Sequence, residues 1–209
     1  MAGGATRVVD DAMRAYYDAR AHEHDDWWDA GGRFGDLDRP GWDDELGAVA
    51  GLLSRLEPAR TLDVACGTGF FTRHLRDDDV ALDQSRPMLD VAAARLPGAR
   101  IVRGEAVPLP FADDAFERVV TTNFYGHLLA GERAAFLAEA RRVAPELVVV
   151  DAALHAGVAP EEHQERATDD GRRHVVYKRY FSGEGLAAEL GRGEVLLDGA
   201  WFVAVRARR

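Results

Sequence analysis

The sequence predicts an α/β fold with a doubly wound, mostly parallel sheet, an N-terminal helical lid and an antiparallel hairpin at the C-terminal edge of the sheet. Three observations predict this fold. From residue 60 onward, short apolar stretches alternate with stretches of helical period. Two helical stretches precede the first strand, and two β-like stretches joined by Asp198 and Gly199 end the chain. The length of 209 residues suits a single domain with a substantial core.

The N-terminal part, about residues 1–58, is expected to form the lid. Apolar residues at helical spacing predict a helix over residues 10–30, and glycines and a proline between residues 31 and 41 end it. A second helix is predicted over residues 43–56. Because both helices precede the first strand, we expect them to cover the carboxyl end of the sheet.

Residues 59–209 are expected to form the core. Strands of the parallel sheet are predicted at residues 61–65, 80–82, 100–102, 118–122 and 147–151. The helices between them are predicted at residues 69–76, 87–95 and 132–143. Residues 156–171 are expected to be a loop. A last helix, residues 185–190, precedes the hairpin strands at residues 194–197 and 201–206.

Composition excludes several classes of function. The formal net charge is −10, which argues against nucleic acid and against anionic membranes as partners. A single cysteine, Cys66, allows no internal disulfide, and residues 1–11 lack the apolar core of a signal peptide. We therefore expect a cytoplasmic protein, a monomer or homodimer, that acts on a small molecule.

A strand, a glycine-containing turn and a predicted helix surround Asp63. Gly67 and Gly69 let the backbone approach a ligand, and the amide groups at the start of a helix are free to bind it. Asp83, twenty positions after Asp63, ends the next strand, where a carboxylate can accept hydrogen bonds from both ribose hydroxyls. This combination predicts a nucleoside ligand.

A dinucleotide is one alternative for that ligand. Pyrophosphate binding usually needs a third glycine three places after Gly69, but Thr72 stands there, after Phe70 and Phe71. These two bulky side chains favour a ligand that has a compact amino-acid tail and no phosphates.

Asp63, Ala65, Gly67 and Gly69 resemble motif I of the class I S-adenosylmethionine (SAM)-dependent methyltransferases, with Ala65 where glycine is commoner. Residues 81–89 are similar to the ribose-binding strand end of that family. Residues 103–117 resemble the loop that flanks the adenine, and residues 142–145 its turn into strand five. The resemblance implies a Rossmann-like core, SAM as cofactor and S-adenosylhomocysteine as product.

The same resemblance implies a set of cofactor-binding residues. Asp83 would hold the ribose, and Glu105 would read the adenine edge, although the family more often has aspartate there. Tyr17 matches the first tyrosine of a lid signature, and His24 stands where the second is usual. The residues expected to bind the cofactor are Tyr17, Asp63, Ala65, Cys66, Gly67, Gly69, Asp83, Gln84, Met88, Gly104, Glu105, Ala106, Asn123 and Phe124.

Histidines are the candidates for a general base, which is needed only when the acceptor keeps its proton until attack. His127 ranks first because it follows the fourth strand at the carboxyl edge, and His24 in the lid ranks second. For each, a structural or solvated histidine is the alternative. The residues expected to line the acceptor pocket are Trp28, Tyr125, His155, Tyr177 and Tyr180.

No metal site is expected. The adjacent acids at residues 25–26, 77–79 and 113–114 diverge on a helix or strand and suit solvated positions. The leading hypothesis is therefore methyl transfer from SAM to an oxygen, nitrogen or carbon atom of a small molecule. Two alternatives stay open: a SAM-binding enzyme with non-methylating chemistry, of cyclase or hydroxylase type, and a non-catalytic methyltransferase-like partner subunit.

Overall fold

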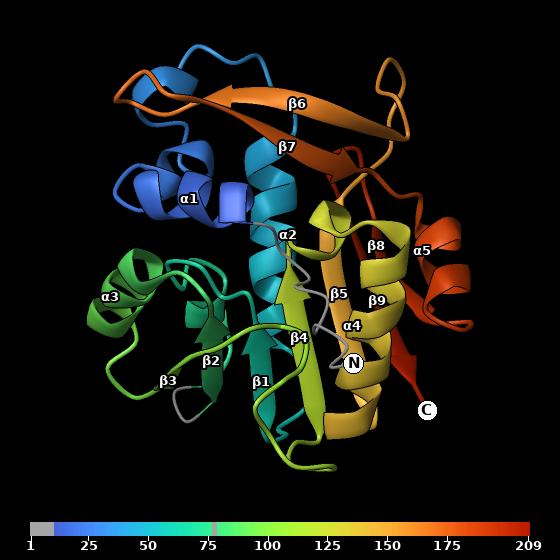
Figure 1. Cartoon of the computed structure of the whole chain (residues 1–209). Helices are drawn as coiled ribbons and strands as arrows, with labels where there is room; N and C mark the ends of the chain where they lie inside the picture. Colours follow the sequence, from blue (N-terminus) through green and yellow to red (C-terminus); the bar gives the residue numbers. More distant parts are fainter. Residues whose placement is uncertain (1–10, 77–78) are drawn as a thin grey trace, which may run out of the picture.

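The computed structural model describes residues 11–76 and 79–209. Its main sheet has the strand order β3-β2-β1-β4-β5-β9-β8 (Figure 1). The first five strands are parallel, and β9 joins β5 in antiparallel register. The strands of this sheet are β1 (Thr61–Val64), β2 (Val80–Asp83), β3 (Arg100–Arg103), β4 (Arg118–Thr122), β5 (Glu146–Ala152), β8 (Glu194–Asp198) and β9 (Phe202–Arg208).

Helices cover both faces of this sheet, which confirms the doubly wound architecture. The helices are α1 (Asp11–Ala19), α2 (Trp42–Ser54), α3 (Arg86–Arg95), α4 (Ala130–Val143) and α5 (Gly183–Glu189). Val49 of α2 packs with Val120 and Val148 on one face, whereas Phe136 of α4 packs with Val119 and Val149 on the other. Because side chains alternate along a strand, neighbouring valines of one strand serve the two opposite cores.

The C-terminal hairpin is also confirmed. Strands β8 and β9 pair in antiparallel register with a bulge between Val195 and Leu197, and β9 lies between β5 and β8. Asp198 accepts the amide hydrogen bond of Gly183 at the start of α5 (3.0 Å). The hairpin therefore completes the sheet and also anchors the last helix.

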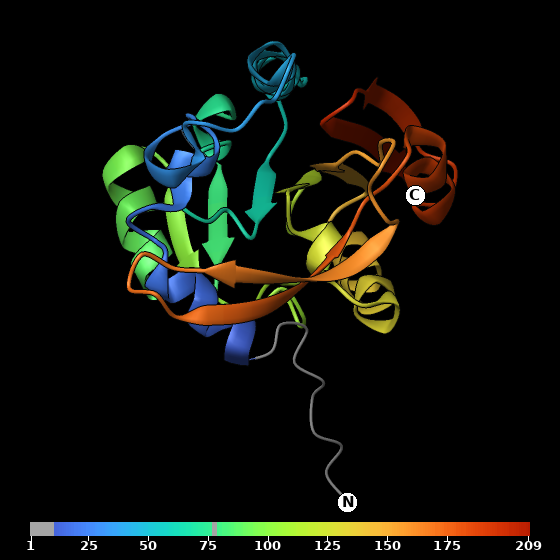
Figure 2. The same cartoon turned by 90° about the horizontal axis from the view of Figure 1, so that it is seen from above.

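Two strands fall where the sequence predicted none. Strands β6 (Glu161–Ala167) and β7 (Arg173–Arg179) pair along their full length as a separate two-stranded ribbon. The ribbon crosses above the carboxyl ends of the main strands (Figures 1 and 2). The expectation of a loop over residues 156–171 is therefore wrong. Strand β6 contains no large apolar residue, so the apolar alternation that signals a strand is missing, and its polar side chains at Gln164 and Arg166 border a cavity.

The helix expected over residues 10–30 is wrong beyond Ala19. After α1 the chain turns and forms two short 3₁₀ segments, η1 (His24–Trp27) and η2 (Gly32–Phe34). Side chains of His24 and Asp25 bond to the loop after β1, and these tertiary contacts outweigh helix propensity. Residues 11–34, which include α1, η1 and η2, are called the lid below.

The helix expected over residues 69–76 is reduced to the single turn η3 (Thr72–His74). Phe70, Phe71 and Thr72 are all buried, so three successive side chains point into the protein, which an amphipathic helix does not allow. Helix α2 lies within the stretch expected to form the lid, yet it packs against β9 and the sheet face. Among the described residues, no helix is long and apolar enough to cross a membrane.

Candidate cofactor and acceptor site

The loop after β1 departs from ordinary backbone geometry. Ala65, Gly67 and Gly69 have φ values of 61°, 55° and 75°. This left-handed conformation costs about 1–2 kcal/mol for a residue with a Cβ, so Ala65 holds local strain. A Cβ on Gly67 would fit, with the His24 ring at an ordinary contact distance of 3.8 Å, whereas one on Gly69 would meet Leu96 at 2.7 Å. Gly67 thus leaves room for a ligand, and Gly69 permits close packing against α3.

Asp63 lies beneath this loop and is fully buried. Its Oδ2 accepts a hydrogen bond from the Thr72 hydroxyl at 2.6 Å, while Oδ1 has no partner among the described residues. Burial raises the pKa of Asp63 to about 7, and the neighbouring carboxylates of Asp83 and Asp79 act in the same direction. Thr72, which stands where a dinucleotide site has its third glycine, therefore serves as the partner of a buried acid.

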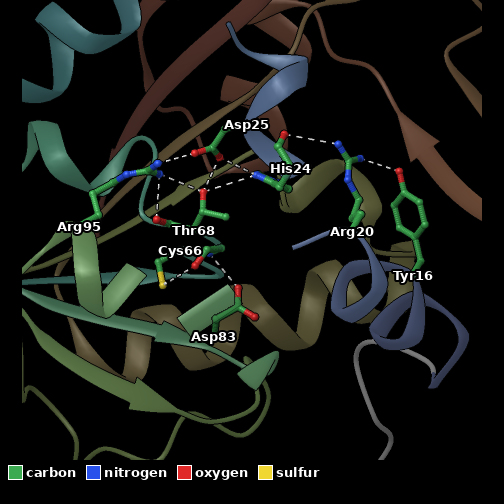
Figure 3. Close-up of polar contacts among 9 residues, drawn as sticks. Tyr16, Arg20, His24, Asp25, Cys66, Thr68, Asp83 and Arg95 are labelled. Carbon is green, nitrogen blue, oxygen red and sulfur yellow. Dashed lines mark hydrogen bonds and ion pairs between the residues drawn. The ribbon is translucent and has the colours of Figure 1, made fainter. Parts of the chain in front are cut away.

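Asp83 joins the end of β2 to the same loop. Its Oδ2 accepts the Gly67 amide hydrogen bond at 2.9 Å (Figure 3). Its Oδ1 accepts the Ser85 amide hydrogen bond at 2.8 Å. The carboxylate also borders a cavity of about 530 Å³, a volume typical of small-molecule sites. Burial raises the pKa of Asp83, while these amide hydrogen bonds lower it.

Helix α1 contacts side chains next to Asp83 at this end of the cavity. Arg14 donates to Gln84 Oε1 (3.2 Å) and to Glu105 Oε1 (2.6 Å). Asp18, one turn later, lies 2.5 Å from the Ser85 hydroxyl. The lid therefore fixes two of the side chains expected beside an adenine.

A second set of polar contacts fastens η1 to the loop and to α3. Asp25 Oδ1 accepts from the Thr68 hydroxyl (2.6 Å) and lies 3.1 Å from His24 Nδ1, and Oδ2 pairs with Arg95 at 2.5 Å (Figure 3). Arg95 also donates to the Thr68 carbonyl (2.9 Å). Burial alone would raise the pKa of Asp25, but the hydrogen bonds from His24, Thr68 and Arg95 hold it well below its usual range. We call Asp25, Thr68 and Arg95 the lid latch.

His127 stands at the opposite end of the cavity, in the turn η4 (Tyr125–His127) after β4. Its Nδ1 lies 2.7 Å from the Tyr177 carbonyl oxygen, which can only accept, so Nδ1 carries the proton. Its Nε2 therefore accepts the hydrogen bond from the Tyr17 hydroxyl at 3.1 Å. Burial lowers the pKa of His127 well below its usual range, and the positive charges of Lys178 and Arg166 lower it further. The imidazole is neutral at pH 7.

Part of the chain is similar in sequence to known methyltransferases. Residues 62–146 match the family described as "Methyltransferase domain". A demethylmenaquinone methyltransferase from Renibacterium salmoninarum is 40% identical over 103 residues, which are 48% of this chain and 40% of that protein. A malonyl-[acyl-carrier protein] O-methyltransferase from Pseudescherichia vulneris is 32% identical over 138 residues, 65% of this chain and 54% of that protein. This chain thus spans about half the length of the curated relatives it matches.

Solved structures agree on the fold. A DhpI complex with SAM and HEP has a TM-score of 0.74 at 23% identity and covers 100% of both chains. A DhpI–SAH complex has a TM-score of 0.72 at 24% identity and covers 95% of both chains. The chain therefore has the fold of these structures, and its residues 62–146 resemble a methyltransferase domain.

Most of the residues predicted to bind a cofactor border the cavity described above. Two do not: Asp63 lies under the loop and Gly69 packs against Leu96. Asn123 borders the cavity with φ 54°, and its buried Nδ2 has no hydrogen-bond partner among the described residues. The predicted cofactor residues along the cavity are Tyr17, Ala65, Cys66, Gly67, Asp83, Gln84, Met88, Gly104, Glu105, Ala106, Asn123 and Phe124.

The predicted acceptor residues divide into two groups. Trp28, His155 and Tyr180 border the cavity, as do both candidate bases, His24 and His127. Tyr125 is fully buried, with its hydroxyl on Glu189 (2.9 Å), and the Tyr177 hydroxyl donates to the exposed Glu161 (2.7 Å). Neither tyrosine borders the cavity. The contribution of position 177 to the site is instead its backbone carbonyl, which orients His127.

Sequence reasoning missed several residues that border the cavity. Arg20 follows α1, whereas Gln164, Arg166 and Lys178 come from the ribbon. The ribbon has no motif content, so only one signal was available: Lys178 is the single lysine among 26 basic residues. Within the part of the chain that the structure describes, no group of three or more acidic, histidine or cysteine side chains is placed to hold a metal. Asp77 and Asp78 lie outside the described residues.

Proposed function

We propose that this protein transfers the methyl group of SAM to a nucleophilic oxygen, nitrogen or carbon atom of a small molecule. One observation carries the proposal. A single cavity beneath the lid and the ribbon extends from Gly67 and Asp83 at one end to the His127–Tyr17 pair at the other. A cofactor seated on the loop and an acceptor beside His127 would share this space.

The residues present fit SAM. Asp83 ends β2 with a carboxylate on the cavity wall, which suits the two ribose hydroxyls. Gly67 leaves room for the methionine part, and the Nδ2 of Asn123 is a buried donor without a partner. Phe70 and Phe71 also border the cavity and disfavour a diphosphate in the same place.

When bound, SAM supplies an electrophilic methyl on a sulfonium. The chain contributes alignment and exclusion of water, which account for most of the barrier reduction expected in a direct displacement. The lid latch and the α1 contacts to Gln84 and Glu105 hold the cover over the strand ends. Where the acceptor keeps a proton, His127 Nε2 is the atom that takes it, because Nδ1 is protonated and the ring is neutral.

The test combines binding with turnover. Calorimetry with S-adenosylhomocysteine should show micromolar binding, and a metabolite extract with methyl-labelled SAM should yield a labelled small molecule. The Asp83→Ala protein is the matched negative control. Consumption of a metabolite without label in any product would instead favour non-methylating chemistry. Absence of S-adenosylhomocysteine binding would contradict the proposal altogether and favour a non-catalytic role.

A further inference from the structure

Three cationic side chains border the cavity at its acceptor end. They are Arg20 after α1, Arg166 on β6 and Lys178 on β7. Arg20 and Lys178 are 6% and 5% exposed, although the chain as a whole has a net charge of −10. Burying a cation costs several kcal/mol unless a partner compensates it, so two buried cations and a third, half-buried one in the same wall need an explanation.

Protein partners satisfy these three cations to different degrees. Lys178 Nζ forms a buried ion pair with Asp151 at 2.6 Å. Arg20 donates to the Tyr16 hydroxyl (2.6 Å) and the His24 carbonyl (3.4 Å), both neutral oxygens (Figure 3). Arg166 donates twice to the amide oxygen of Gln164 (3.0 and 2.6 Å). Within the described residues, neither guanidinium pairs with a carboxylate.

One donor in this set has no partner. The Nε of Arg20 is buried and lacks a hydrogen-bond acceptor among the described residues. The two guanidinium groups approach the same ring, with Arg20 5.3 Å and Arg166 5.9 Å from the centroid of Tyr16. The positive charges of Lys178, Arg166 and Arg20 all lower the pKa of His127. All three cations therefore act on the same region of the cavity.

We propose that the methyl acceptor carries an oxyanion, a carboxylate or a phosphoryl group, that binds among Arg20, Arg166 and Lys178. The planar fork of arginine matches two oxygens of such a group, and lysine adds a point charge. The acid groups along the cavity wall all have partners: Glu105 pairs with Arg14, Glu165 pairs with Arg173, and Asp83 accepts two backbone amide hydrogen bonds at the loop after β1. This inference rests on the proposed function, because it names the substrate class of the same site.

The experiment measures binding of simple oxyanions to the whole protein. Orthophosphate, methylphosphonate and malonate are titrated calorimetrically, with chloride at matched ionic strength and with neutral acetamide as references. Each titration is run with and without saturating S-adenosylhomocysteine. We expect at least one oxyanion to bind more tightly than chloride in both conditions, and the preferred one separates a carboxylate from a phosphoryl acceptor.

Three variants locate the binding. Arg20→Gln and Arg166→Gln should each weaken the preferred oxyanion by about tenfold, as expected for loss of charge-assisted hydrogen bonds. The control is Arg172→Gln, which removes one positive charge from the exposed turn of the same ribbon, where Arg172 pairs with Asp170 away from the cavity. Its affinity should stay within about twofold of the unaltered protein. Arg166 is half-buried and tests the inference even where Arg20→Gln does not fold.

Three other outcomes overturn the inference. The inference is wrong if no oxyanion binds better than chloride, or if Arg172→Gln weakens binding as much as Arg166→Gln, which places the anion elsewhere. If both arginine variants weaken S-adenosylhomocysteine by the same factor as they weaken the oxyanion, the cations serve the carboxylate of the cofactor. Failure of S-adenosylhomocysteine to bind contradicts the proposed function instead, while titrations without it still test the oxyanion site.

Discussion

The two ends of the cavity are built in different ways. The end near β1 and β2 depends on backbone: positive φ angles at Ala65 and Gly67, and amide groups bonded to Asp83. The end near His127 depends on side chains from segments far apart in the sequence, such as Arg20 and Lys178. Backbone geometry can serve one ligand shared by a whole family, whereas exchangeable side chains can adapt to different acceptors.

The lid connects these two ends. Asp25 of the latch bonds to Thr68 in the loop and to Arg95 on α3, and His24 next to it borders the cavity. Tyr17, one helical turn before Arg20, bonds to His127. The lid therefore contacts residues at both ends of the cavity. Substitutions can separate the contributions of the lid and of each end to ligand binding.

The largest effect is expected from Asp83→Ala, which breaks the cofactor end alone. The variant removes the carboxylate for the ribose and leaves the amides of Gly67 and Ser85 without their acceptor. Affinity for S-adenosylhomocysteine should fall about 100-fold in calorimetry, given about 1.5–3 kcal/mol for each charged hydrogen bond. Asp90→Ala, at an exposed position of α3, is the control. Equal losses in both variants would refute the role of Asp83.

An intermediate effect is expected from Arg95→Gln, which releases the latch. The variant loses the ion pair to Asp25 and the hydrogen bond to the Thr68 carbonyl, both only partly exposed. S-adenosylhomocysteine should bind about tenfold more weakly, and amides of residues 24–31 should exchange hydrogen faster. Arg86→Gln, which removes an exposed arginine from the same helix, should change neither quantity. Unchanged exchange in Arg95→Gln would show that other contacts hold the lid.

The smallest effect on ligand affinity is expected from Asp63→Asn, which changes a charge beneath the loop and no cavity contact. Because the folded pKa is about 7, the folded protein keeps a proton between about pH 4 and 7 that the unfolded chain releases. This group therefore lowers the free energy of unfolding as pH rises through that window. Asparagine can still accept from Thr72 and carries no charge. Between pH 5 and pH 8, the free energy of unfolding measured in urea should change by about 2 kcal/mol less in the variant than in the unaltered protein.

Asp90→Asn, at an exposed position, should leave the pH dependence of the unaltered protein in place. An identical pH dependence in Asp63→Asn and the unaltered protein would mean that Asp63 is ionised in the folded state. The pairs of variants together separate binding at the cofactor end, closure by the lid and support beneath the loop.

The cofactor end could be predicted from sequence because its signals are local. Gly67 and Asp83 terminate neighbouring strands, and the carboxyl ends of parallel strands meet at one edge of a sheet. The same logic placed Gly69 at the ligand, but its φ of 75° serves packing against Leu96, and a glycine alone does not tell these uses apart.

The acceptor end could not be predicted because it depends on tertiary position. Gln164 and Arg166 belong to a strand that has no apolar alternation, and their inward orientation follows only from pairing with β7. Tyr177 was expected to offer its ring and offers its carbonyl instead. Backbone groups are the same in every residue, so no residue type signals such a role.

Lys178 has a practical consequence. It is the only lysine of the chain, it is buried, and it pairs with Asp151 in the middle of the ribbon's contact with the sheet. A protease that cleaves only after lysine therefore has a single site, which becomes accessible when β7 separates from its neighbours. The rate of cleavage at this bond therefore reports how often the ribbon opens, and the measurement needs no label and no substitution.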